Sequence, residues 1–132
     1  MSVEKMDVAV AVVQFKGKIL LLKRGHHKKY FPNKWENAGG KINKHETPEE
    51  AVIREVKEET GLNGKILRRG RTYDWLAEDV IFHIIPFLFE AASDDVKLSE
   101  EHSDCEWVDI ENYVNFDHLD GLEMDYKSLD MI

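Results

Sequence analysis

Two apolar runs open the chain, a Val-rich stretch at residues 7–15 and the segment KILLLK at residues 18–23. Short runs of aliphatic and β-branched residues are typical of strands, and the Lys16-Gly17 pair between them suits a hairpin turn. The pattern therefore predicts two strands joined by a tight turn. The following segment, residues 26–40 (HHKKYFPNKWENAGG), has no period and predicts a loop that leads into a site needing bare backbone.

A helix is predicted from Pro48 to Thr60. Thr47 can cap its first amides, Pro48 suits the first helical position, and Glu50 completes a capping box three residues after Thr47. Gly61 is the residue type favoured just past a helix C-terminus. Both ends of this helix can therefore be placed from local sequence.

This helix has an apolar side and an acidic side. At about 100° per residue, its apolar residues fall along one side: Val52, Ile53 and Val56. Its glutamates cluster within about 100° of arc on another side: Glu55, Glu58 and Glu59. We expect the apolar side to be buried.

Beyond the helix, the pattern predicts strands at residues 65–73, 80–90 and 105–110 and a weakly helical tail from residue 118. Pro86 within the long apolar strand indicates an edge or a bulge, and Gly121 interrupts the helical pattern of the tail. Strands around one early helix, closed by a late helix, predict an α+β layered domain with a mixed sheet.

Composition adds the expectation of a single domain over residues 1–132, which is long enough to bury a core without disulfides. A hydrophobic content of 42% with 33% charged residues gives no sign of disorder. The lone Cys105 cannot pair within the chain, so we expect a reducing, cytoplasmic location. A small, half-buried residue beside Trp107 is the preferred reading of this cysteine over a nucleophile.

Charge and hydropathy exclude several classes of partner. The N-terminal segment lacks the basic end and cleavage site of a signal peptide, and the longest apolar run, residues 80–92, is shorter than the roughly 20 residues of a membrane helix. A formal net charge of −8 argues against binding a nucleic-acid polymer. Local basic patches at residues 26–29 and 68–71 leave small phosphorylated ligands as candidates.

The acidic side of the helix has two readings, a solvated surface or a metal site. Surface helices relieve repulsion with Lys or Arg four residues away, whereas the residues four before and after Glu55 are Ala51 and Glu59. Like charges at this spacing destabilise a helix by a few tenths of a kcal/mol per pair. A hard divalent cation reverses that sign, because Mg²⁺ prefers carboxylate oxygens and substrate phosphates.

The spacing of residues 40–62 narrows the choice. The segment GKINKHETPEEAVIREVKEETGL fits the pattern G-x5-E-x7-R-E-U-x-E-E-x-G-U, where U is aliphatic, at every defined position. The matching residues are Gly40, Glu46, Arg54, Glu55, Val56, Glu58, Glu59, Gly61 and Leu62. This segment resembles the signature of the Nudix hydrolases, the MutT-like family. The resemblance extends less closely to residues 18–24, 35–40 and 100–110.

The resemblance implies a Nudix-type α/β/α sandwich with a mixed β-sheet between helices. It also implies hydrolysis of a pyrophosphate bond in a nucleoside diphosphate derivative, with Mg²⁺ or Mn²⁺ as cofactor. Glu58 and Glu59 would be metal ligands, Glu55 a further ligand or the base that deprotonates water, and Arg54 with Glu46 would brace this geometry.

Two further positions follow from the resemblance. The backbone carbonyl of Gly39 matches a metal ligand of relatives, where a side chain would crowd the approach. Glu101 is the choice for a distal acidic ligand or base, with adjacent Glu100 as its competitor. Ala38 replaces the proline that usually precedes the two glycines, which removes a rigid φ but no ligand.

Candidates for substrate contacts come from the basic and aromatic residues. The phosphate candidates are Arg24, Lys28 and Lys29, with Arg69 and Arg71 as further basic side chains. The candidates for stacking on a base are Tyr30, Phe31, Trp35, Tyr73 and Trp75. The histidines, including His102 near Cys105, match no zinc spacing.

For a short MutT-like chain without an added recognition domain, the resemblance favours hydrolysis of a (deoxy)nucleoside triphosphate, oxidised nucleotides included, to the monophosphate and pyrophosphate. The alternatives are an ADP-ribose, ADP-sugar or other nucleoside-diphosphate-linked substrate, a non-catalytic nucleotide-binding sensor domain, and a structural acidic helix without metal. The expected partner is a small nucleotide, with no nucleic-acid polymer and no membrane, for a monomer or homodimer. The sequence leaves open the substrate, the number and kind of metal ions, and which glutamate is the base.

Overall fold

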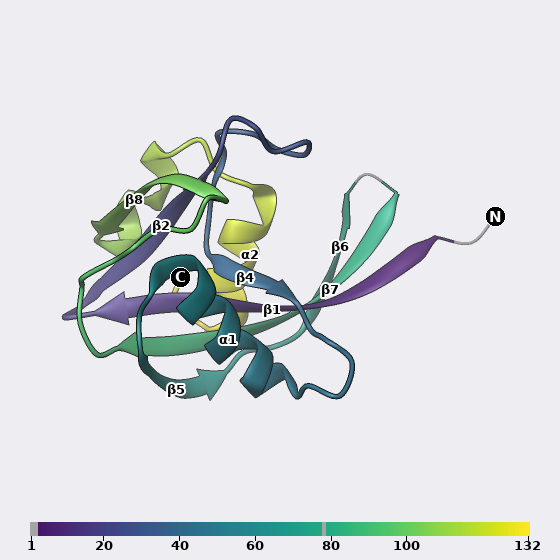
Figure 1. Cartoon of the computed structure of the whole chain (residues 1–132), viewed down its shortest axis with the longest axis horizontal. Helices are drawn as coiled ribbons and strands as arrows, with labels where there is room; N and C mark the ends of the chain where they lie inside the picture. Colours follow the sequence, from purple (N-terminus) through teal and green to yellow (C-terminus); the bar gives the residue numbers. More distant parts are fainter. Residues whose placement is uncertain (1–2, 78) are drawn as a thin grey trace.

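A computed structural model describes residues 3–77 and 79–132 of the chain (Figure 1). Its elements in chain order are β1 (Glu4–Phe15), β2 (Lys18–Arg24), β3 (Trp35–Glu36), β4 (Ala38–Lys41), α1 (Pro48–Thr60), β5 (Gly64–Arg69), β6 (Tyr73–Ala77), β7 (Val80–Ala91), β8 (His102–Val108), the 3₁₀ helix η1 (Ile110–Asn115) and α2 (Asp120–Ser128). Within these ranges the chain has no helix with the length and apolar character needed to cross a membrane.

The long strands β1 and β7 form the middle of one mixed sheet. They pair in parallel from Glu4 opposite Val80 to Gln14 opposite Glu90. The other strand pairs of the described residues are antiparallel, in the order β3-β2-β1-β7-β5, with β4 on β1, β6 on β7 and β8 on β2.

Strands β1 and β2 diverge after their hairpin. They pair at Gln14 with Ile19 and Phe15 with Lys18. Farther from the turn, β3 pairs with β2 and β4 pairs with β1, so residues 35–41 lie between the diverging strands. The expected loop is therefore partly strand. Its Asn, Ala and Gly residues have low intrinsic strand propensity, and the two flanking strands supply the pairing.

The two faces of the sheet are covered by different helices, as the predicted α/β/α sandwich requires (Figure 1). Alternation along β1 directs Ala9, Ala11 and Val13 toward α1 and Val12 toward α2. The α1 side contains Leu20, Leu22, Ala51, Val52, Val56, Ile85, Phe87 and Phe89. The α2 side contains Ile19, Leu21, Leu88, Tyr113, Leu122, Tyr126 and Leu129.

Helix α1 has the predicted bounds and caps. The Glu50 amide donates to Thr47 Oγ1 at 3.1 Å, and the Thr47 amide donates to a Glu50 carboxylate oxygen at 2.9 Å. Gly61 ends the helix with a φ of 72°. The expectation of a buried Ile53 was wrong: this side chain is 47% exposed, because the sheet covers a narrower side of α1 than the apolar arc suggested.

Three other predictions differ from the structure. The single strand expected at residues 65–73 is two strands, β5 and β6, which both pair with β7. Pro86 lies in an interior strand, opposite the break between β5 and β6, where its carbonyl accepts from Gly70 N at 2.8 Å. Gly121 lies within α2, which begins at Asp120.

Candidate functional site

A cavity of about 330 Å³ lies on the α2 side of the sheet, beside β1, β6 and β7. Its β1 wall is Met6, Val8 and Val10, which alternate with the residues that face α1. Predicted site residues bound it as well: Gly39, Gly40, Glu59, Glu101, Arg24, Lys28, Tyr30, Phe31, Tyr73 and Trp75. The structure thus brings the acidic helix and the aromatic candidates to one cavity.

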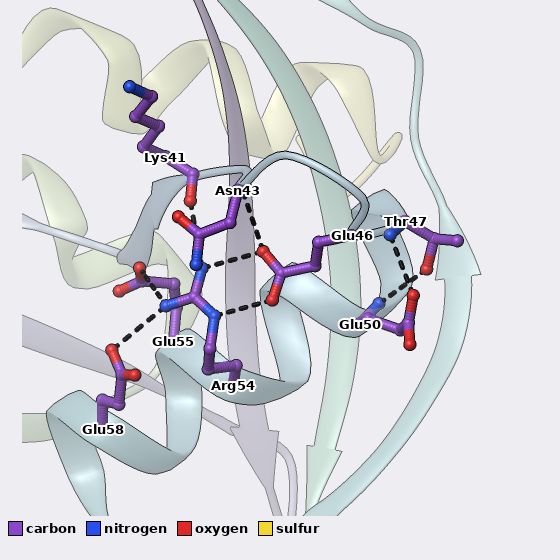
Figure 2. Close-up of polar contacts among 8 residues, drawn as sticks. All are labelled: Lys41, Asn43, Glu46, Thr47, Glu50, Arg54, Glu55 and Glu58. Atoms are coloured by element: carbon purple, nitrogen blue, oxygen red, sulfur yellow. Dashed lines mark hydrogen bonds and ion pairs between the residues drawn. The ribbon is translucent and has the colours of Figure 1, made fainter.

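Arg54 lies among the carboxylates of Glu46, Glu55 and Glu58 (Figure 2). Together with Glu59 these residues form the acidic cluster. Arg54 Nε and Nη2 donate to the two Glu46 carboxylate oxygens at 2.7 and 3.0 Å, and Nη2 also donates to the Lys41 carbonyl at 3.0 Å. Its Nη1 donates to Glu55 at 2.9 Å and to Glu58 at 3.2 Å. These hydrogen bonds raise the pKa of Arg54 and hold the pKa of Glu46 at about 2.

Arg54 reduces the repulsion between the glutamates on the acidic side of α1. The spacing rule treats neighbours in sequence as facing apart, so it gave Glu55 no cationic partner. The long Arg54 side chain nevertheless reaches the carboxylates of both Glu55 and Glu58. Part of the repulsion on the acidic side is therefore relieved within the chain.

Glu59 is the most enclosed of the three glutamates on the acidic side of α1. It is 4% exposed, and its Oε1 accepts from Gly39 N at 2.8 Å. Burial raises the pKa of Glu59 well above its usual range, and the carboxylates of Glu36, Glu55 and Glu101 add to that rise. Burial also raises the pKa of Glu55, although Arg54 opposes it. A carboxylate in such a place is ionised when a cation compensates it.

The two glycines of β4 allow close approaches on its two sides. A Cβ at Gly39 would lie 2.5 Å from the Ala9 carbonyl oxygen of β1, so the constraint at this position comes from strand packing. A Cβ at Gly40 would lie 2.5 Å from the Glu55 carboxylate. The expected crowding near the carboxylates therefore applies to Gly40, and Gly39 is needed for the pairing of β4 with β1.

The donor set suits a hard divalent cation. Mg²⁺ and Mn²⁺ accept oxygen ligands, which here are the Gly39 carbonyl and the carboxylates of Glu55, Glu58, Glu59 and Glu101. In the described part of the chain no three His, Cys, Asp or Glu side chains stand already gathered around one point. Glu55 and Glu58 each accept a hydrogen bond from Arg54, and Glu59 accepts one from Gly39 N; each carboxylate keeps further acceptor sites for a cation.

Glu101 reaches this cluster from the loop before β8. It lines the cavity and acts on the pKa of both Glu55 and Glu59. Its backbone carbonyl accepts from Gly25 N at 2.9 Å, which holds the loop to the end of β2. Position therefore favours Glu101 over its competitor, Glu100.

The predicted phosphate candidates have different surroundings. Arg24 bounds the cavity, yet its guanidinium donates to Glu36 at 3.2 Å and to the Tyr30 carbonyl at 3.0 Å. Lys28 also bounds the cavity, whereas Lys29 Nζ lies 5.2 Å from the centre of the Tyr30 ring. Arg71 pairs with Asp130 at 2.9 Å.

The aromatic candidates divide into two groups. Phe31 and Trp75 lie side by side in the cavity wall, with ring centres 5.8 Å apart. Trp35 instead packs on Phe116 at 5.0 Å, in the core under α2. Tyr30 and Tyr73 line the cavity as well, so four of the five stacking candidates bound it.

Sequence reasoning missed a buried polar group beside these aromatics. Asn37 Nδ2 donates to Asp125 Oδ2 at 2.9 Å, and the Tyr73 hydroxyl donates to Asp125 Oδ1. Asn37 is 6% exposed and Asp125 4%. A single Asp in a weakly helical tail reads as a surface residue, and only the place of Asn37 in the WENAGG lead-in could have drawn attention to it.

Comparisons with known proteins give matches over most of the chain. The model of the NUDIX domain matches residues 4–128. The chain is 32% identical to an RNA pyrophosphohydrolase of Hydrogenovibrio crunogenus, over 83% of this chain and 79% of that protein. It is 31% identical to the nucleoside triphosphatase NudI of Escherichia coli O81, over 83% of this chain and 86% of that protein.

Solved structures show the same fold. A MutT protein from Methanosarcina mazei Go1 superposes with a TM-score of 0.82 at 27% identity, covering 99% of this chain and 96% of that one. A NUDIX hydrolase from Nitrosomonas europaea gives a TM-score of 0.83 at 19% identity, over 97% and 90% of the two chains. The α+β sandwich and its connectivity are therefore those of known proteins.

Proposed function

The chain belongs to the NUDIX domain family and is a nucleotide pyrophosphohydrolase, and we propose that it cleaves a free nucleoside triphosphate to the monophosphate and pyrophosphate with Mg²⁺. The main support is that the acidic cluster adjoins the aromatic cavity. Glu59, a member of that cluster, and Gly39, whose amide donates to it, both line the cavity. A substrate whose base occupies the cavity would therefore place its phosphates beside the glutamates of α1.

The size of the cavity supports a single nucleoside. At about 330 Å³ it lies near the lower limit of ordinary ligand sites, roughly 300–1,000 Å³. One base and its sugar fill such a volume, and a second nucleoside would extend into solvent. The base and sugar of a nucleoside triphosphate would occupy the cavity, and its phosphates would lie at the acidic cluster. The 31% identity to a nucleoside triphosphatase agrees with this choice.

We assign the residues to roles as follows. The carboxylates of Glu58 and Glu59 and the Gly39 carbonyl would hold the cation, with Glu55 and Glu101 each as a further ligand or the base. A divalent ion bound there lowers the pKa of a coordinated water and neutralises charge on the phosphates.

The remaining steps belong to side chains of the chain. Arg54 keeps Glu55 and Glu58 oriented through hydrogen bonds of 2.9 and 3.2 Å. Glu55 or Glu101 accepts the proton of the attacking water, because each is a carboxylate beside the ligand set. Lys28, at the cavity wall, would supply positive charge to a phosphate that reaches it.

A substrate screen with Mg²⁺ or Mn²⁺ tests this proposal. Free (deoxy)nucleoside triphosphates, ADP-ribose, ADP-sugars, dinucleoside polyphosphates and RNA with a 5′-triphosphate are compared by release of phosphate or pyrophosphate. We expect the free triphosphates to give the highest kcat/KM. Faster cleavage of ADP-ribose or of the RNA end would replace the proposed substrate, and binding without any turnover would indicate a nucleotide sensor.

Variants on α1 test the site assignment. Glu59→Gln should lower kcat by two orders of magnitude or more while the protein still folds, because it removes a buried anionic ligand. Glu49→Gln is the matched control: it makes the same charge change in the first turn of the same helix, where Glu49 is exposed and 3.8 Å from Arg69. Near wild-type turnover by Glu59→Gln, with normal Mg²⁺ dependence, would show that the assignment is wrong.

A further inference from the structure

The aromatic part of the cavity carries a polar group that the hydrolytic chemistry does not use. Asn37, between β3 and β4, and Asp125, on α2, meet there although 88 residues separate them in the chain. Apolar side chains border the same cavity: Val8, Val10, Trp75, Phe82, Ile84, Leu119 and Leu122. Polar groups placed among apolar walls fix the orientation of a ligand and select it.

The hydrogen-bonding capacity of this group is unbalanced toward acceptors. Asn37 Nδ2 donates to Asp125 Oδ2 at 2.9 Å, and the Tyr73 hydroxyl donates to Asp125 Oδ1. The Tyr73 hydroxyl also lies 3.1 Å from the Gly121 carbonyl oxygen, so it and one N–H of Asn37 face acceptors of the protein itself. Asn37 Oδ1 is buried and finds no donor among the described residues, and a carboxylate has acceptor sites beyond the two in use.

An unpaired buried acceptor costs about 1–3 kcal/mol, so a ligand that brings donors is favoured over one that brings acceptors. We propose that Asn37 and Asp125 form an acceptor pair that selects nucleobases presenting hydrogen-bond donors, guanine above all. This inference rests on the proposed function, because it requires the cavity to hold the base of a nucleotide.

The four common bases then rank by the donors on their edges. Guanine offers an adjacent ring N–H and amino group, which can meet both acceptors. Adenine and cytosine offer one amino group beside a ring-nitrogen acceptor. Uracil and thymine have a single N–H between two carbonyl oxygens, and these oxygens would face the acceptors of Asn37 and Asp125.

Two measurements on the wild-type protein test the ranking. The first is kcat/KM for GTP, ATP, CTP and UTP at pH 8, where Asp125, with a pKa of about 7, is ionised. The second is binding of the four nucleoside monophosphates, followed by tryptophan fluorescence because Trp75 lines the cavity. We expect guanine nucleotides to exceed uracil nucleotides by roughly tenfold or more in both, the effect of one mismatched hydrogen bond.

Asp125→Asn is the decisive variant. It keeps the shape of the side chain and adds an amide NH₂, so the group of Asn37, Tyr73 and residue 125 gains donors and loses acceptor capacity. The guanine-to-uracil ratio of kcat/KM should fall about tenfold or invert. Asp120→Asn, the same charge change at an exposed position of α2, should leave the ratio unchanged.

The outcomes separate the two proposals. Guanine-selective binding of monophosphates without hydrolysis of any triphosphate would refute the hydrolase assignment and leave the acceptor pair in place. Equal kcat/KM and equal binding for all four bases would overturn the acceptor pair, as would an unchanged ratio in Asp125→Asn. Thermal unfolding of each variant shows whether it is folded, and a shift of the ratio cannot arise from a smaller folded fraction.

Discussion

Replacing Gly40 by alanine adds one methyl group beside the acidic cluster and nowhere else. The new Cβ would lie 2.5 Å from the Glu55 carboxyl carbon and from one of its oxygens. Gly40 has no positive φ, so alanine can adopt its backbone conformation. The strain falls on the end of a flexible side chain, which can turn away.

The size of the effect follows from this distance. Ordinary contacts of a Cβ begin near 3.4 Å, so the Glu55 carboxylate must move by about 1 Å and lose its 2.9 Å hydrogen bond to Arg54. A displacement of this size in a catalytic group lowers the rate by ~100-fold, equivalent to about 2.7 kcal/mol of transition-state stabilisation. Loss of folding stability should stay below about 1 kcal/mol, since alanine also restricts the unfolded chain.

Gly39→Ala is the contrasting variant. Its Cβ would lie 2.5 Å from the Ala9 carbonyl oxygen and 3.0 Å from Val10 Cα, both in the backbone of β1. Neither atom can move without disturbing the pairing of β4 with β1. We expect this variant to lose about 1–3 kcal/mol or more of folding stability.

Three measurements on both variants distinguish these effects: thermal unfolding, Mn²⁺ binding by calorimetry, and kcat/KM with a nucleoside triphosphate. Gly40→Ala should be folded, weak in Mn²⁺ binding and slow, whereas Gly39→Ala should unfold at a lower temperature. Wild-type metal binding and activity in Gly40→Ala would refute the placement of Glu55 in the site. Equal loss of stability in the two variants would refute the distinction between the glycines.

Two further predictions concern charge. Arg54→Lys should lower kcat/KM by ~100-fold with an unchanged circular dichroism spectrum, because one ammonium group cannot hold Glu46, Glu55 and Glu58 together. Arg69→Lys is the control. Equal kcat/KM values in the two variants would contradict the role of Arg54. Burial raises the pKa of Asp125 from 3.8 to about 7, so the folded state holds this proton more tightly and stability should fall as pH rises between these values. Urea unfolding should show that Asp125→Asn lacks this fall, a difference on the order of 4 kcal/mol, and parallel pH profiles would contradict it.

Local patterns predicted helix α1 and the β1–β2 hairpin well. The capping box at Thr47 and Glu50 and the left-handed Gly61 lie where the sequence placed them, because caps depend on residues three or four apart. Residues 35–41 were read as a loop, because they form strands only through pairing with β1 and β2. Patterns within one segment cannot report such pairing.

The sequence by itself determined the family signature, its helix and the acidic cluster, since these lie in one segment of 23 residues whose spacing fixes the relative positions of the side chains. The tertiary structure decided what faces that cluster. It brought Glu101 to Glu59 and joined Asn37 to Asp125 across 88 residues. Contacts between distant segments depend on how strands and helices pack, and that packing has no counterpart in the periodicity of any one segment.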